Sequence, residues 1–290
     1  MIVETPLVFA CAGETLLGVL TQPDDACSTG VIFLIGGDQY RVGSHRQFRL
    51  LATALGRAGI ASLRFDVRGM GDSSGEQPDF TEQGPDIAAA VNALLTANPA
   101  LQRVVAVGLC DGASSALINI SAFGQRLAGI CLLNPWARSE ETLAATQVRH
   151  YYLARLLAPA FWHKLLTGRV GVWQALREFL GKFWGVLAKR APPLDEASFQ
   201  AKMAYGLSRF GGPVLLVLSG KDLTAQEFEL CAASHPAWSG VLEQTLLDCH
   251  RLPEADHTFS SAAWRQEVEV CVVNWVLNKV NIYEPVDPAA

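Results

Sequence analysis

Cys110 lies in the one stretch of the chain whose residue types and spacing suggest covalent chemistry, GLCDG (108–112). Four apolar residues, Val104 to Val107, precede the stretch and a helix-like segment follows it, so the pattern predicts a strand, a sharp turn and a helix. This is the pattern of a nucleophile elbow, G-x-S-x-G, with cysteine in place of serine. The strained turn of an elbow lifts the nucleophile above the sheet. The next backbone N–H, here that of Asp111, then points at the developing oxyanion.

A second oxyanion donor is expected from the loop that follows the third strand. Gly36, Gly37 and Asp38 stand at the end of the apolar run GVIFLIGG (30–37). Glycine lets backbone approach a substrate closely, so the backbone of Gly37 and Asp38 is the predicted partner of Asp111 in the oxyanion hole.

A base and its orienting acid are expected later in the chain, in the order nucleophile, acid, histidine. Asp222 follows a buried strand in LSGKDLTA, and His257 precedes the final helix in EADHTFS. We expect His257 to take the proton of Cys110 and Asp222 to hold the imidazole in the right tautomer. Asp248 and His250 compete for these two roles on sequence grounds, and a structural role for His257 stays open.

The cysteines favour a reduced, cytoplasmic protein without a metal or cofactor. The chain has seven cysteines, an odd number, with no CxxC pair and no metal-like Cys/His spacing. A buried, inert Cys110 is the alternative to a nucleophile, because free cysteine is often buried. The other six are expected to be structural or incidental: Cys11, Cys27, Cys131, Cys231, Cys249 and Cys271.

The elements that must position these residues alternate along the chain. Short apolar runs at 30–37, 61–67, 104–107, 128–136 and 211–222 read as strands, after two N-terminal ones, and a further strand is expected near 242–247. Amphipathic segments between them read as helices, with later helices near 225–234 and 260–278. This alternation predicts an α/β protein, with a mostly parallel sheet of about eight strands covered by helices on both faces.

Residues 137–209 interrupt that rhythm and read as helices only, at about 139–157, 159–167, 171–188 and 195–209. We expect a helical lid here, inserted before the last strands, with the core formed by 1–136 and 210–290. The lid holds eleven Lys/Arg against five Asp/Glu, so its net charge is about +6, while the whole chain is at −5. A basic face with aromatic residues would suit peripheral contact with an anionic membrane surface.

Substrate contacts are expected near the oxyanion loop and from the aromatic residues of the lid. Arg41, His45 and Arg46 would grip a carboxylate or phosphate, although a solvated helix start explains them equally well. The lid aromatics are expected to form mostly lid core, with a few lining an apolar pocket. The candidate substrate-binding residues are Gly36, Arg41, His45, Arg46, Trp136, Tyr151, Tyr152 and Trp162.

Several segments together resemble a known family. With the elbow, DVRGMGDSSG (66–75) and the ordered Asp and His, the chain resembles the α/β-hydrolase superfamily. GGDQYRVGSHRQF, LRFDVRGMGDSSG, RHYYLARLLAPAFWHKLLTGRV and ADHTFS resemble the exosortase A system-associated hydrolase 1 family, from about residue 30 to 275. The resemblance implies an α/β-hydrolase fold and a link to bacterial exopolysaccharide and protein-sorting loci. Cysteine replaces the superfamily's usual serine, as it does in dienelactone hydrolases, which are active.

The composition and these motifs favour an enzyme. Half of the residues are hydrophobic and 18% are charged, so a large core is expected, and a net charge of −5 gives no sign of nucleic-acid binding. No apolar run approaches the ~18 residues of a membrane span, and the N-terminus does not read as a signal peptide. We expect a hydrolase acting on a small-molecule or carrier-bound activated ester or thioester. An acyltransferase is the first alternative, and a non-catalytic scaffold with the same fold is the second.

Overall fold

The central strand β3 (Thr29–Leu34) is buried on both faces. In the computed structural model, which describes residues 1–24, 28–138, 197–244 and 246–283, its side chains enter two cores in alternation. Val31 and Phe33 pack in a cluster with helices α1 (Gln47–Arg57) and α10 (Ala262–Trp275), and Ile32 and Leu34 pack in a second cluster with α2 (Gly84–Ala97). Such continuous apolar runs are typical of strands covered by helices on both sides.

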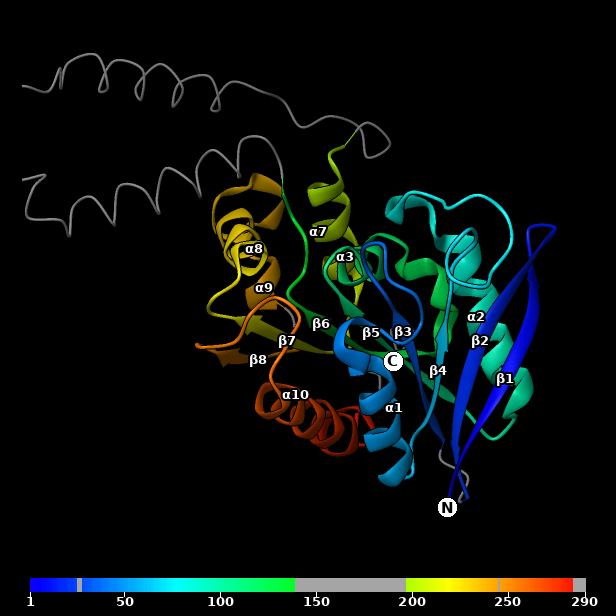
Figure 1. The fold of residues 1–290 in the computed structure, drawn as a ribbon. Helices are drawn as coiled ribbons and strands as arrows, with labels where there is room; N and C mark the ends of the chain where they lie inside the picture. Colours follow the sequence, from blue (N-terminus) through cyan, green and yellow to red (C-terminus); the bar gives the residue numbers. More distant parts are fainter. Residues whose placement is uncertain (25–27, 139–196, 245, 284–290) are drawn as a thin grey trace, which may run out of the picture. The chain divides into compact units, whose positions relative to one another are not determined.

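Eight strands form one sheet in the order β1-β2-β4-β3-β5-β6-β7-β8 (Figure 1). The six strands β3 to β8 pair in parallel, and β2 joins them through antiparallel pairing with β4. The predicted mostly parallel sheet with helices on both faces is therefore confirmed. The remaining strands are β1 (Ile2–Cys11), β2 (Glu14–Pro23), β4 (Ala61–Phe65), β5 (Arg103–Leu109), β6 (Leu127–Leu133), β7 (Pro213–Ser219) and β8 (Leu246–Leu252).

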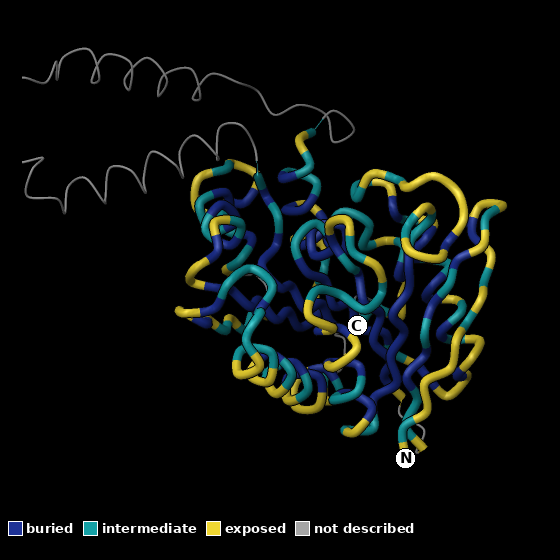
Figure 2. Tube along the Cα trace, viewed as in Figure 1, coloured by how far each residue is buried: buried dark blue, intermediate teal, exposed yellow. Residues whose placement is uncertain are grey.

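Helices cover the two faces of this sheet unequally (Figure 1). One face is packed by α1 and α10, whose apolar side chains share a cluster with β3, β5, β6 and β7. The other face carries α2 and, over β6 and β7, the helices α3 (Asp111–Ile118), α7 (Phe199–Arg209) and α8 (Leu223–Ser234). Figure 2 shows the strands as the buried centre of this part of the chain. Shorter turns of helix lie at Ser44–Arg46, Phe80–Glu82, Ile120–Arg126, Pro236–Trp238, Val241–Gln244 (α9) and Val276–Val280.

The second compact unit of the chain ends at Ser198, whereas the expected helical lid ran to residue 209. The chain divides into one unit of Met1–Arg138 with Phe199–Ala290 and another of Ser139–Ser198. The helix predicted at 195–209 is α7, and it belongs to the first unit because it buries Met203 and Leu207 in the same core cluster as α3. The helices predicted within 139–188, with Tyr151, Tyr152 and Trp162, lie outside the described residues. Among the residues described, no helix is long and apolar enough to span a bilayer.

The parallel strands bring several loops to one edge of the sheet. β3 and β5 end in register, with Leu34 opposite Gly108, and β5 and β6 end with Leu109 opposite Leu133. β6 and β7 continue the alignment, with Leu133 opposite Val217. The loops at 35–46, 110, 134–138 and 220–222 therefore start from the same carboxyl edge, which is where open α/β sheets bind ligands.

Candidate active site

Cys110 lies between β5 and α3 in a backbone conformation that few non-glycine residues adopt, with φ 59° and ψ −127°. Its N–H donates to the Leu133 carbonyl (3.0 Å), and its carbonyl accepts from the N–H groups of Ala113 (3.1 Å) and Ser114 (3.2 Å). A side chain at Gly112 would overlap the Leu34 carbonyl, so only glycine lets the turn lie this close to β3. The predicted strand, sharp turn and helix are confirmed.

Asp222 holds His257 while it caps the helix that follows. Its carboxylate accepts from the backbone N–H groups of Thr224 (3.0 Å) and Ala225 (3.2 Å) at the start of α8, a position that favours negative charge. The same carboxylate lies 2.7 Å from Nδ1 of His257, and its side chain is 5% exposed. Nδ1 therefore carries the proton that faces Asp222, which leaves Nε2 for chemistry.

The groups on either side of His257 favour its charged form. Burial acts against the charge, but hydrogen bonds with Asp222 and with the Cys110 side chain, and the charges of both groups, raise the pKa of His257 from 6.5 to about 10. The structure thus places the imidazole between Cys110 and Asp222. A cationic imidazole beside a sulfur stabilises the thiolate, which is the reactive form.

The two competing candidates lie elsewhere. Nε2 of His250 is 2.9 Å from the Glu267 carboxylate, and Asp248 lies mid-strand on β8 with Lys279 at 3.9 Å. Both pairs are largely exposed. The structure brings together Asp222 and His257, and it does not bring Asp248 and His250 into that arrangement.

Asn134 is a further site residue, and the sequence analysis did not single it out. It is fully buried at the end of β6, where its Nδ2 donates to the His257 carbonyl (2.9 Å) and to Oγ of Ser219 (2.9 Å). Its Oδ1 accepts from the Ser219 N–H (2.8 Å). The available signal was a polar residue directly after a buried apolar strand, in LLNPW (132–136).

The oxyanion loop meets the elbow through the side chain of Asp111. The Gly37 N–H donates to Oδ1 of Asp111 at 2.6 Å, and Asp38 lies exposed beside it. A side chain at Gly36 would overlap both that oxygen and the Leu109 carbonyl. The structure therefore brings Gly36, Gly37 and Asp111 together. The sequence predicted a role for the backbone N–H of Asp111, but in the structure it is the Asp111 side chain that accepts from the Gly37 N–H.

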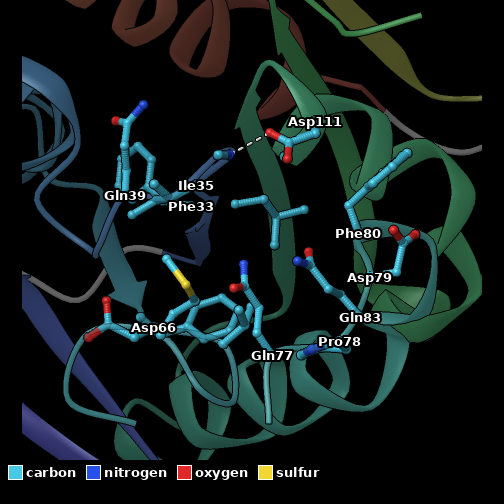
Figure 3. Close-up of a pocket in the computed structure, with 16 residues that line it drawn as sticks. Phe33, Ile35, Gln39, Asp66, Gln77, Pro78, Asp79, Phe80, Gln83 and Asp111 are labelled. Atoms are coloured by element: carbon cyan, nitrogen blue, oxygen red, sulfur yellow. Dashed lines mark hydrogen bonds between the residues drawn. The ribbon is translucent and has the colours of Figure 1, made fainter. Parts of the chain in front are cut away.

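A cavity of about 380 Å³ reaches the elbow at Asp111 and Gly112 (Figure 3). The side-chain amides of Gln77 and Gln83 point into it, and Phe80 closes one side. Its lining mixes aromatic rings with amides and carboxylates, so it presents both apolar surface and hydrogen-bonding groups. The Trp136 ring packs against Phe80, with centroids 5.3 Å apart, so this predicted substrate residue supports the cavity wall.

Arg41, which we expected to grip a substrate anion, pairs in this structure with two carboxylates of its own chain. Its guanidinium pairs with Asp66, and with Asp72 at 2.6 Å, while its backbone N–H donates to Asp66 at 2.6 Å. Its charge is therefore compensated within the loop that also contains DVRGMGDSSG. His45 and Arg46 are exposed, with φ values of 53° and 61°, so they lie on the surface as the alternative interpretation expected.

The other described cysteines differ from Cys110 in their surroundings. Burial raises the pKa of Cys131 well above 9.0 and the pKa of Cys231 to about 11. Burial also raises the pKa values of Cys11, Cys249 and Cys271. Within the described residues, no group of three or more His, Cys, Asp or Glu side chains is arranged to hold a metal ion.

Many solved structures share the fold of this chain. An esterase from Pyrococcus furiosus, Pf2001, has a TM-score of 0.64 at 16% identity, over 96% of this chain and 94% of that one. A dienelactone hydrolase from Anabaena variabilis has a TM-score of 0.61 at 16% identity, over 96% and 99%. Est1E from Butyrivibrio proteoclasticus, solved with ferulic acid, has a TM-score of 0.60 at 15% identity, over 95% and 99%.

Family membership rests on the sequence itself. Comparison with curated proteins finds no match. A family model described as the alpha/beta hydrolase family matches residues 32–269, which include the elbow, Asp222 and His257. Together with the eight-stranded sheet and the strand-turn-helix at Cys110, this match shows that the chain belongs to the alpha/beta hydrolase family.

Proposed function

We propose that this hydrolase acts on an activated ester or thioester through a covalent thioester acyl-enzyme on Cys110. The observation that supports the proposal is the pairing of His257 with Asp222 at 2.7 Å, and the Cys110 side chain also helps to raise the pKa of this imidazole. A nucleophile, a base and an orienting acid in this relation form the triad of acyl-transfer enzymes.

The first half of the reaction is acylation. The Cys110 thiolate attacks the carbonyl carbon, a C–S bond forms, and the carbonyl oxygen becomes an oxyanion that backbone N–H groups of the elbow and the oxyanion loop would stabilise. When the oxyanion collapses, the bond to the leaving group breaks. The leaving alkoxide or thiolate takes its proton from Nε2 of His257.

The second half is deacylation. His257, now neutral, removes a proton from water, and the resulting hydroxide attacks the thioester carbon. The C–S bond breaks, the acid leaves, and the Cys110 thiolate with a protonated His257 is restored. Asp222 keeps the ring in position throughout, because its carboxylate is fixed by the start of α8. The link to exopolysaccharide or exosortase metabolism is part of the proposal and depends on the family resemblance alone.

Intact-protein mass spectrometry after brief incubation with 4-nitrophenyl acetate tests the proposal. We expect wild type to gain one acetyl group, mapped to Cys110, and we expect Cys110→Ala to gain none there. His257→Ala should acylate at least about 100-fold more slowly. Cys249→Ala is the matched control, because Cys249 is an exposed thiol on β8, and it should label like wild type.

The decay of the adduct then separates hydrolysis from transfer. Loss of the acetyl group in water alone supports a hydrolase, while loss only after addition of an amine or thiol supports an acyltransferase. Equal labelling of wild type and Cys110→Ala would contradict the proposed nucleophile.

A further inference from the structure

The Asp111 side chain occupies a backbone donor of the oxyanion loop. The Gly37 N–H donates to Oδ1 of Asp111 at 2.6 Å. Its own backbone N–H, the Gly112 N–H and the Cys110 side chain also act to lower the pKa of the Asp111 carboxyl, so these donors face the carboxylate as well. The N–H of the residue after the nucleophile and the N–H of the oxyanion loop are the groups expected to bind the oxyanion of a tetrahedral intermediate.

Oδ1 of Asp111 accepts from the same Gly37 N–H that is expected to bind an oxyanion. Oxyanion-hole donors lie about 2.7–3.1 Å from the oxygen they stabilise, and the Gly37 donor is already at hydrogen-bond distance from a carboxylate oxygen. The glycine at 36 is part of this arrangement, since any side chain there would overlap Oδ1 of Asp111. The loop at Gly36 and Gly37 therefore accommodates the Asp111 carboxylate, whose oxygen takes the hydrogen bond that a substrate oxyanion would take.

A carboxylate that stayed in place would oppose the reaction. It would hold the donors and would set a negative charge against the oxyanion that forms on the substrate. The cavity of about 380 Å³ is lined by Asp111 itself, so a carboxylate that rotates away from Gly37 has space to enter. Figure 3 shows Asp111 at the rim of this cavity, joined to Gly37 by the hydrogen bond.

We propose that Asp111 occupies the oxyanion site of the resting protein and must leave it before Cys110 attacks an acyl carbonyl, which makes Asp111 a specificity-determining residue. This inference rests on the proposed acyl transfer at Cys110. Acyl donors that cannot displace the carboxylate react slowly, however well they fit the rest of the site. Burial raises the pKa of Asp111 although these hydrogen bonds act to lower it, and displacement is easier for a carboxylate that is costly to keep charged.

Two reactions of the same sulfur separate this role from a structural one. Acylation by 4-nitrophenyl acetate passes through an oxyanion, whereas alkylation by iodoacetamide displaces iodide and forms none. We would measure both rate constants at Cys110 in wild type, Asp111→Asn and Asp111→Ala. Asp248→Asn is the control, because it removes the same charge at a half-buried position of β8, away from the elbow.

The ratio of acylation to alkylation is the expected readout. Asp111→Ala should raise this ratio about tenfold or more, since a single oxyanion donor contributes about 10²–10³ in rate. Asp111→Asn should raise it less, because a neutral amide oxygen still accepts from Gly37. Asp248→Asn should leave the ratio unchanged. An unchanged or lower ratio in Asp111→Ala would overturn the proposal and show that the carboxyl group assists catalysis.

The contact itself is tested without any activity. In protein labelled with ¹⁵N-glycine, the Gly37 amide proton, assigned through Gly37→Ala, should resonate far downfield and move upfield in Asp111→Ala. A Gly37 resonance that does not move overturns the inference and leaves the proposed function in place. Alkylation of Cys110 without acylation in wild type and both variants would instead overturn the proposed function, and this inference with it.

Discussion

Asn134 at the end of β6 donates a hydrogen bond to the backbone carbonyl of His257, which lies 123 residues later in the chain (2.9 Å). The same side chain joins β6 to β7 through two hydrogen bonds with Ser219. The Ser219 hydroxyl in turn donates to the Asp256 carbonyl (2.9 Å). The buried Asn134 amide thus fixes the backbone of the loop that carries His257, and Asp222 orients the imidazole ring.

Replacement of Asn134 by alanine removes three hydrogen bonds from a fully buried position. We expect the free energy of unfolding to fall by about 2–4 kcal/mol, because buried partners are left unsatisfied. Urea denaturation followed by circular dichroism measures this loss. Asn92→Ala, at an exposed position of α2, should change stability by less than about 0.5 kcal/mol. A loss no larger in Asn134→Ala than in Asn92→Ala would mean that the three hydrogen bonds of Asn134 contribute nothing to stability.

Replacement of Asp222 by asparagine preserves the cap of α8, since an asparagine oxygen also accepts from helix N–H groups. It removes the charge that holds the imidazole, so we expect Cys110 acylation to fall by about 10³–10⁴-fold with little loss of stability. Stopped-flow acylation and thermal unfolding provide the two measurements. The competing carboxylate supplies the control, because Asp248→Asn should acylate like wild type. Comparable rates in the two variants would mean that Asp222 does not orient the base.

The stability of the protein should depend on pH through His257. Folding raises the pKa of this imidazole from 6.5 to about 10, so its protonated form stabilises the folded chain. The contribution is complete below about pH 6.5 and is lost as the pH rises through about 10. The difference in Tm between wild type and His257→Gln should therefore be large at pH 6 and should shrink toward pH 10.5.

Thermal unfolding monitored by circular dichroism between pH 6 and 10.5 follows this difference. His250→Gln is the matched control, because it breaks an exposed pair with Glu267 that contributes little to stability. A gap between wild type and His257→Gln that widens with pH would contradict the assigned direction of the shift.

Replacement of Arg41 by methionine leaves the Asp66 carboxylate without its cation, and the Asp66 side chain is 0% exposed. Breaking a buried pair in this way is expected to cost about 3 kcal/mol in the free energy of unfolding. Urea denaturation measures this loss. Arg46→Met lies five residues later on the surface and should be close to neutral. If both variants were equally stable, the loop would not depend on the pair.

The fold could be predicted in large part because its signals are local. Buried parallel strands read as unbroken apolar runs, and β3, β5, β6 and β7 all lie where such runs stand. The last strand was misplaced, since the sequence suggested 242–247 and β8 spans Leu246–Leu252. Val241–Gln244 forms a turn of helix instead, and the strand LLDCHRL is polar because β8 is at the sheet edge.

The site could be predicted only where spacing and order determine it. Asp222 and His257 follow from their places after a strand and before a helix, and the structure sets them 2.7 Å apart. The contacts of Asp111, Asn134 and Arg41 depend on which loops meet across the sheet, at separations of 74, 123 and 25 residues. No single stretch of sequence records such pairings.

The backbone of Cys110 places stability in conflict with function. At φ 59° and ψ −127°, a side chain at this position is strained, and glycine would adopt the same turn at little cost. At an ordinary position, a glycine variant has a lower Tm than the alanine variant. At position 110 we expect the reverse, so Cys110→Gly should have a higher Tm than Cys110→Ala in thermal unfolding. A single substitution, Cys110→Gly, would then relieve the strained turn but also remove the nucleophile. Selection for stability alone would therefore remove the sulfur.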